Sequence, residues 1–301
     1  MSQISNQQLR FASAATFLAA SIWGLYWVPL RLFVDNGVDG SWTVALLNAP
    51  PVLLLLPLLL WRRDELDGHL GRAMLIGVFA GAGLALYASG LVFSSVVRAT
   101  LLFYLTPVWA TLMGLFWLNE RVGTLRWLAI ALGLCGMLLL LSGGDATSTP
   151  FGIGDVFGLM SGFFWAAAAA MMKRYPSTPI VGMTFFQFAG CAGIAMMIGL
   201  ALPASPLPTM TAVTDSLAIA SLASIGVILP TVLVIFWAQR MLFPGRAGLL
   251  MMSEVLVAVI SASIFLPEER MAGLEWLGAG LIIFACLLEV LSTPKDAPAT
   301  T

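Results

Sequence analysis

The chain has 301 residues, of which 60% are hydrophobic and only 10% are charged. A soluble domain carries about 25% charged residues, which cover its water-facing surface, so this composition excludes an ordinary soluble protein. The net charge of −1 provides no basic field that would hold nucleic acid.

The first apolar run extends from Phe11 to Phe33. This run is too long for the hydrophobic region of a cleavable signal peptide, and it lacks a convincing cleavage site. We therefore interpret it as the first membrane span.

Ten apolar runs follow one another along the chain. A membrane helix needs about 20 mainly apolar residues to cross about 30 Å of hydrocarbon, and each run approaches that length. The linkers are short, which favours a compact bundle of neighbouring antiparallel helices. The predicted fold class is therefore an all-α polytopic membrane protein with ten transmembrane helices. The expected spans are approximately 12–33, 41–61, 72–93, 98–117, 123–141, 154–173, 180–202, 213–237, 246–266 and 272–292.

Basic residues predict the orientation of these spans. If the N-terminus lies inside, 11 of the 14 Lys and Arg residues fall on the inner side, and only Arg31, Arg98 and Arg270 fall outside. Inner loops of membrane proteins carry an excess of Lys and Arg. We therefore expect a multi-pass protein of a bacterial-type inner membrane, with both termini in the cytoplasm.

The two halves of the sequence resemble each other. Arg98-Ala-Thr-Leu-Leu, followed by Leu118-Asn-Glu-Arg, recurs as Arg246-Ala-Gly-Leu-Leu followed by Leu266-Pro-Glu-Glu-Arg. Each copy holds five spans, and an odd number makes the second copy enter the membrane from the opposite side. We expect two inverted five-helix repeats, residues 1–145 and 146–301. Inverted repeats are a recurring basis of alternating access in secondary transporters, although a duplication kept only for packing stays open.

Glu254 lies about eight residues, roughly 12 Å, from the inner end of the ninth expected span. A carboxylate at that depth is costly, so it usually faces a cavity or a partner and marks a functional site. Contact with a substrate ammonium group, proton binding and a purely structural hydrogen bond are the three interpretations.

Some aromatic residues lie nearer the middle of their spans than interface belts do. Trp23 and Trp165 are among them, and they correspond to each other in the repeat. An aromatic wall would bind apolar groups and, by cation–π attraction, an ammonium group, while each ring alone is also an ordinary packing residue. The predicted substrate-binding residues are Trp23, Trp27, Tyr87, Tyr104, Trp165 and Glu254.

The sequence offers no pattern for catalysis or for a bound metal. The single histidine, His69, lies in a charged segment, and the three cysteines lie in apolar runs without metal-ligand spacing. No P-loop for ATP is present. We therefore predict a protein that is not an enzyme and has no cofactor, no metal site and no catalytic residue.

These motifs resemble the EamA family of the drug/metabolite transporter superfamily over nearly the whole chain. The resemblance is carried by Trp23-Gly24, Tyr104-Leu-Thr-Pro107-Val, Leu118-Asn-Glu-Arg121, Ser253-Glu-Val-Leu and Leu266-Pro-Glu-Glu-Arg270. The Trp23 and Tyr104–Pro107 regions look most like bacterial amino-acid exporters of the YddG type. The family's second halves often carry proline after the glutamate, whereas this chain has Val255, so no proline is present to break the helix there.

The resemblance implies a secondary-type exporter of small metabolites, most of all amino acids including aromatic ones, working by alternating access. Its partners would be that small molecule and membrane lipid, with no nucleic acid. An exporter of drugs or sugar conjugates is the alternative, and an intramembrane enzyme or a channel is a more distant one. The exact substrate, the coupling ion and the oligomeric state stay open, a monomer being the simplest form.

Overall fold

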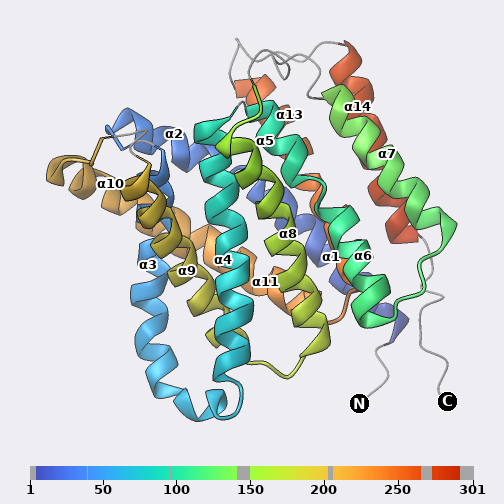
Figure 1. The fold of residues 1–301 in the computed structure, drawn as a ribbon, viewed down its shortest axis with the longest axis horizontal. Helices are drawn as coiled ribbons and strands as arrows, with labels where there is room; N and C mark the ends of the chain where they lie inside the picture. The colour runs from blue at the N-terminus through green and yellow to red at the C-terminus, as the bar shows by residue number, and fades with distance from the viewer. Residues whose placement is uncertain are drawn as a thin grey trace.

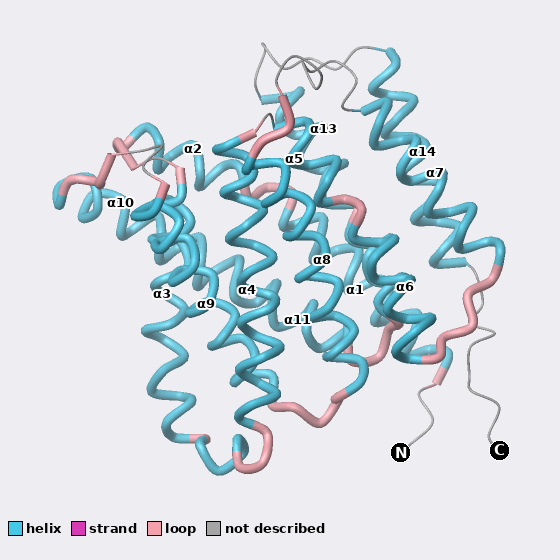
Figure 2. Tube along the Cα trace, in the orientation of Figure 1, coloured by secondary structure: helices cyan, strands magenta, loops and turns pink. Residues whose placement is uncertain are grey.

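The computed structural model describes residues 5–38, 40–94, 96–140, 150–202, 206–265 and 273–291. Every regular element in these ranges is helical, which confirms the predicted all-α class (Figure 2). The α-helices are α1 (Asn6–Trp23), α2 (Trp27–Asp35), α3 (Ser41–Trp61), α4 (Leu70–Phe93), α5 (Val96–Phe103), α6 (Thr106–Leu118), α7 (Thr124–Leu140), α8 (Ile153–Arg174), α9 (Ile180–Ala201), α10 (Met210–Ala223), α11 (Leu229–Gln239), α12 (Pro244–Met251), α13 (Ser253–Phe265) and α14 (Gly273–Leu291). A short 3₁₀ helix, η1 (Arg63–Leu66), follows α3, and a π-helical turn, η2 (Ser224–Ile228), joins α10 to α11.

The bundle presents an apolar surface to its surroundings. Large side chains such as Trp61, Phe116 and Leu222 are 80%, 82% and 77% exposed, which suits contact with lipid rather than water. Within the described residues, six segments are long and apolar enough to cross a membrane, and the shorter helix α7 is also apolar. These six are Ser41–Trp61, Leu70–Phe93, Ala99–Leu118, Ile153–Arg174, Ile180–Ala201 and Met210–Gln239. The protein is therefore a multi-pass helical membrane protein, while the count of ten spans stays a prediction.

Four of the expected spans are not continuous α-helices in the structure. The breaks lie between α1 and α2, between α5 and α6, at η2, and between α12 and α13. Proline accounts for three of them, because it lacks the N–H that would bond to the carbonyl four residues earlier. Pro29, Pro107 and Pro230 each follow such a break. At Pro107 the freed carbonyl of Phe103 accepts a hydrogen bond from the Thr106 hydroxyl instead.

The break between α12 and α13 has no proline and is held by tertiary contacts. The backbone turns at Met252, whose N–H donates to the Leu249 carbonyl three residues earlier. The same carbonyl accepts a hydrogen bond from Cys286 Sγ of α14 at 3.3 Å. Ser253 Oγ donates to the Phe17 carbonyl of α1 at 2.9 Å. Neighbouring helices thus satisfy the backbone groups that a break exposes inside a membrane.

The helices pack in pairs that connect the two halves of the chain. α1 contacts α11, α12 and α13, whereas α8 contacts α4, α5 and α6. α7 and α14 lie side by side at one edge of the bundle (Figure 1). Gly158 and Gly162 of α8 let that helix approach α5 closely, since a Cβ on Gly158 would lie 3.0 Å from the Ala99 carbonyl oxygen. Small residues therefore permit the tight helix contacts here.

Candidate substrate pocket

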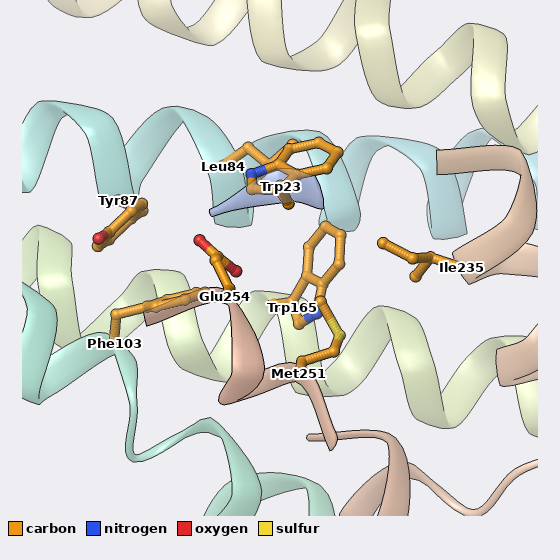
Figure 3. Close-up of a pocket in the computed structure, with 8 residues that line it drawn as sticks. All are labelled: Trp23, Leu84, Tyr87, Phe103, Trp165, Ile235, Met251 and Glu254. Carbon is orange, nitrogen blue, oxygen red and sulfur yellow. The ribbon is translucent and has the colours of Figure 1, made fainter. Parts of the chain in front are cut away.

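A small pocket of about 10 Å³ lies inside the bundle where the broken helices meet (Figure 3). This space holds about one water molecule, so a larger ligand requires the surrounding side chains to move apart. Seven helices contribute to its wall, namely α1, α4, α5, α8, α11, α12 and α13. The lining residues are Trp23, Leu84, Tyr87, Phe103, Trp165, Ile235, Met251 and Glu254.

The helix breaks position half of this lining. Trp23, Phe103 and Met251 are the last residues of α1, α5 and α12, and Glu254 is the second residue of α13. Discontinuous helices that end near the middle of a membrane are a common way to build a transport site, because their ends bring side chains and backbone groups to one point. The pocket therefore depends on the same breaks that hydropathy alone does not predict.

Glu254 lies at the centre of the pocket. Figure 3 shows its carboxylate between the rings of Tyr87, Trp23 and Trp165. The Tyr104 hydroxyl is near this carboxylate, although it makes no hydrogen bond of normal geometry. Among the eight lining residues Glu254 is the only charged one. In the part of the chain that the structure describes, the pocket thus presents one carboxylate surrounded by aromatic and apolar side chains.

The aromatic rings form two groups beside the carboxylate. Trp23 stacks on Tyr26 with ring centroids 5.6 Å apart and an interplanar angle of 9°. On the other side, the Tyr87 and Phe103 ring centroids are 4.4 Å apart. The buried indole nitrogen of Trp165 has no hydrogen-bond partner among the described residues. The pocket can therefore offer ring faces and a carboxylate, while the Trp165 N–H is buried beside it.

The structure brings four of the six predicted site residues to this pocket, namely Trp23, Tyr87, Trp165 and Glu254. Tyr104 lies behind the wall, 3% exposed, with its ring centroid 4.9 Å from that of Phe103. The side chain of Trp27 lies outside the described residues. The role of these six residues as substrate contacts stays a prediction.

Sequence reasoning missed the other four lining residues, Leu84, Phe103, Ile235 and Met251. These side chains are apolar residues in apolar helices, so composition does not distinguish them from packing or lipid-facing positions. Phe103 alone had a usable signal, because it directly precedes Tyr104 and the proline-containing break.

Gly24 brings α1 against α13 beside the pocket. A Cβ added there would collide with the Glu254 carbonyl oxygen and lie 2.8 Å from Val257 Cβ. The Gly24 backbone is helical, with φ −58°. Alanine can adopt this conformation, so only the steric contacts oppose the substitution. We expect Gly24→Ala to destabilise the protein by about 1–3 kcal/mol, as other overpacked cores do. Thermal unfolding in detergent measures this loss.

Gly280→Ala is the matched control, because a Cβ on that α14 residue meets no atom within 4 Å. Alanine there should be neutral or stabilise the helix by up to about 1 kcal/mol. Equal melting temperatures for the two variants would show that the close approach at Gly24 is not needed.

Comparison with known proteins identifies the family. The profile of the EamA-like transporter family matches residues 10–142 and 152–291. The chain belongs to this family. Among the relatives of this chain, the inner membrane transporter YedA of Escherichia coli K12 is 28% identical to it over 300 residues, which cover 95% of this chain and 92% of YedA. The family predicted from the sequence motifs is thereby confirmed.

Two further likenesses carry less information about this chain. A riboflavin transporter of Vibrio cholerae is 28% identical over 155 residues, which cover 47% of this EamA chain and 50% of that protein. A crystal structure of 17% sequence identity superposes with a TM-score of 0.67 over 93% of this chain and 98% of the other. At that identity the second likeness concerns the fold alone.

Proposed function

We propose that this EamA transporter is a secondary-type exporter of small metabolites that carry an ammonium group, with amino acids including aromatic ones as the leading class. The observation that carries the proposal is the single carboxylate of Glu254 in a pocket walled by tryptophan, tyrosine and phenylalanine. A carboxylate attracts an ammonium group, and ring faces attract the same cation through their quadrupoles. A charged residue inside a membrane also usually marks a substrate or ion pathway.

The proposed mechanism is alternating access by two inverted five-helix repeats, residues 1–145 and 146–301, which make ten spans. Packing supports this view, because the first helix of each half contacts the broken fourth span of the other half. α1 contacts α12 and α13, and α8 contacts α5 and α6. Two such units around one site can exchange conformations and open it to either side in turn.

Orientation follows from the basic residues and makes a topology prediction. The turn between α3 and α4, the start of α1 and the end of α14 lie on one side of the bundle (Figure 1), and the proposal assigns that side to the cytoplasm. Reporters fused near Asn6, Gly68 and Asp296 should report cytoplasm, and one near Ala146 should report the exterior. Ala146 and Asp296 lie outside the described residues. A cytoplasmic signal at Ala146 would contradict the inverted repeats.

Transport by the purified protein in liposomes tests the function. The labelled panel would contain amino acids, amines, sugar conjugates and riboflavin. Riboflavin is included because two relatives are named riboflavin transporters. The proposal predicts that labelled ammonium compounds are transported saturably. It also predicts that unlabelled ammonium compounds inhibit this transport. Transport of riboflavin or sugar conjugates alone, with every ammonium compound inert, would overturn it.

The tryptophan pair provides a mutational test of the pocket. We expect Trp23→Ala and Trp165→Ala each to lower transport about tenfold, the effect of losing about 1.4 kcal/mol of ring contact with a bound cation. Uptake is measured per folded molecule. Trp61→Ala is the control, because Trp61 is 80% exposed at the bundle surface and should leave transport unchanged. Unchanged kinetics in both pocket variants would assign Trp23 and Trp165 to packing.

A further inference from the structure

We propose that the pocket prefers organic amines to the corresponding amino acids, so that its best substrates are small monocations with an aromatic or branched apolar body. This inference rests on the ammonium site of the proposed function, and within ammonium compounds it ranks simple amines above the amino acids that lead the class proposed there. It follows from the balance of charges around Glu254 and from the chemistry of the remaining wall.

Charge is the first argument. The eight lining residues contribute one carboxylate and no lysine, arginine or histidine. A bound amine would therefore balance the charge of the pocket by pairing with Glu254. An α-amino acid brings the same ammonium group but also a carboxylate attached to the same carbon atom. That second carboxylate would lie within a few ångströms of Glu254, where two like charges repel strongly because little water separates them.

Solvation is the second argument. Removing a carboxylate from water is unfavourable unless a cation or several hydrogen-bond donors replace the water. The other polar side-chain groups in the wall or next to it are neutral, namely the hydroxyls of Tyr87 and Tyr104 and the indole N–H of Trp165. Arg246 is the basic residue of α12, but it lies near the start of that helix, whereas the pocket residue Met251 ends it, and Arg246 Nε donates to Ser13 Oγ at 3.0 Å.

The wall accounts for the body of the substrate. Trp23 and Trp165 approach the carboxylate from two sides, and Leu84, Ile235 and Met251 complete an apolar surface around them (Figure 3). A cation held at Glu254 would thus have an aromatic face beside it, an arrangement that recognises ammonium compounds elsewhere.

The experiment compares ligands that share a ring and differ only in charge. Binding of tryptamine, tryptophan, tryptophan methyl ester and indole-3-propionate to the purified full-length protein would be measured by calorimetry. Tryptamine and the methyl ester, which lack a free carboxylate, should bind at least about tenfold more tightly than tryptophan, and the indole acid should not bind detectably. Phenethylamine and phenylalanine repeat the comparison with a smaller ring.

Two variants test whether the preference for amines over amino acids arises in the pocket. Glu254→Gln should weaken tryptamine binding at least about tenfold and bring it within about threefold of tryptophan. Glu65→Gln removes a carboxylate from the exposed turn after α3 and should preserve the wild-type preference. Both proteins would be checked for an unchanged melting temperature.

The outcomes separate this inference from the proposed function. Tryptophan binding as tightly as tryptamine, with both lost in Glu254→Gln, would overturn the amine preference and retain the ammonium site. Two results would overturn the inference and the proposed function together. In the first, Glu254→Gln binds tryptamine and tryptophan as tightly as the wild type does. In the second, no ammonium compound binds, while a neutral metabolite binds tightly.

Discussion

Replacement of Glu254 by glutamine is expected to lower transport of ammonium-bearing substrates at least about thirtyfold. Truncation of one partner of a buried charge pair costs about 2–5 kcal/mol, and even the lower figure corresponds to that factor. Glutamine keeps the shape of the side chain but removes its charge, and none of the other seven lining residues is charged. Uptake of labelled substrate into liposomes, corrected for the amount of folded protein, measures the effect.

The stability of the same preparation decides how the result is interpreted. A substrate-binding role predicts that Glu254→Gln unfolds at nearly the wild-type temperature while transport falls. A purely structural glutamate would give the reverse pattern, with lost stability and normal transport per folded molecule. If Glu254→Gln transports normally at both acidic and alkaline pH, the carboxylate is not part of the substrate site. The aromatic and backbone groups would then bind the substrate.

Replacement of Arg126 by methionine is expected to destabilise the folded protein by about 3–5 kcal/mol. The guanidinium group of Arg126 pairs with Glu120 and lies 3.1 Å from Glu289 Oε1. The side chains of these two glutamates are 0% and 1% exposed, so the change removes a cation from beside two buried carboxylates. Thermal unfolding in detergent measures the loss.

Two further variants test this ion network. Arg62→Met breaks an exposed pair with Glu65 and should cost less than about 0.5 kcal/mol. Combining Arg126→Met with Glu120→Gln and Glu289→Gln should recover much of the lost stability, because the buried charges are then removed together. Substrate binding per folded molecule should be unaffected, since none of the three residues lines the pocket. Equal melting temperatures for Arg126→Met and Arg62→Met would contradict a stabilising network.

The helical membrane class, the family and four of the pocket residues follow from the sequence. Hydropathy indicates helices because a chain in lipid must satisfy its backbone hydrogen bonds internally. Glu254 could be recognised because an acid deep in an apolar span is rare and costly. Trp23 and Trp165 could be recognised because they correspond to each other in the repeat and lie away from the span ends. Each of these signals is local, or repeats at a constant offset.

Only the tertiary structure decided where the helices break and which apolar residues form the pocket. The turn at Met252 has no proline and depends on Ser253 bonding to Phe17 of α1 and on Cys286 of α14, partners that are distant in the sequence. Leu84, Ile235 and Met251 resemble any other apolar residue until packing brings their helices together. Intrinsic residue preferences act over a few neighbouring positions, whereas a cavity is defined by side chains from many helices. For this reason the sequence determined the class of protein and its central carboxylate, and the fold determined the shape of the space around it.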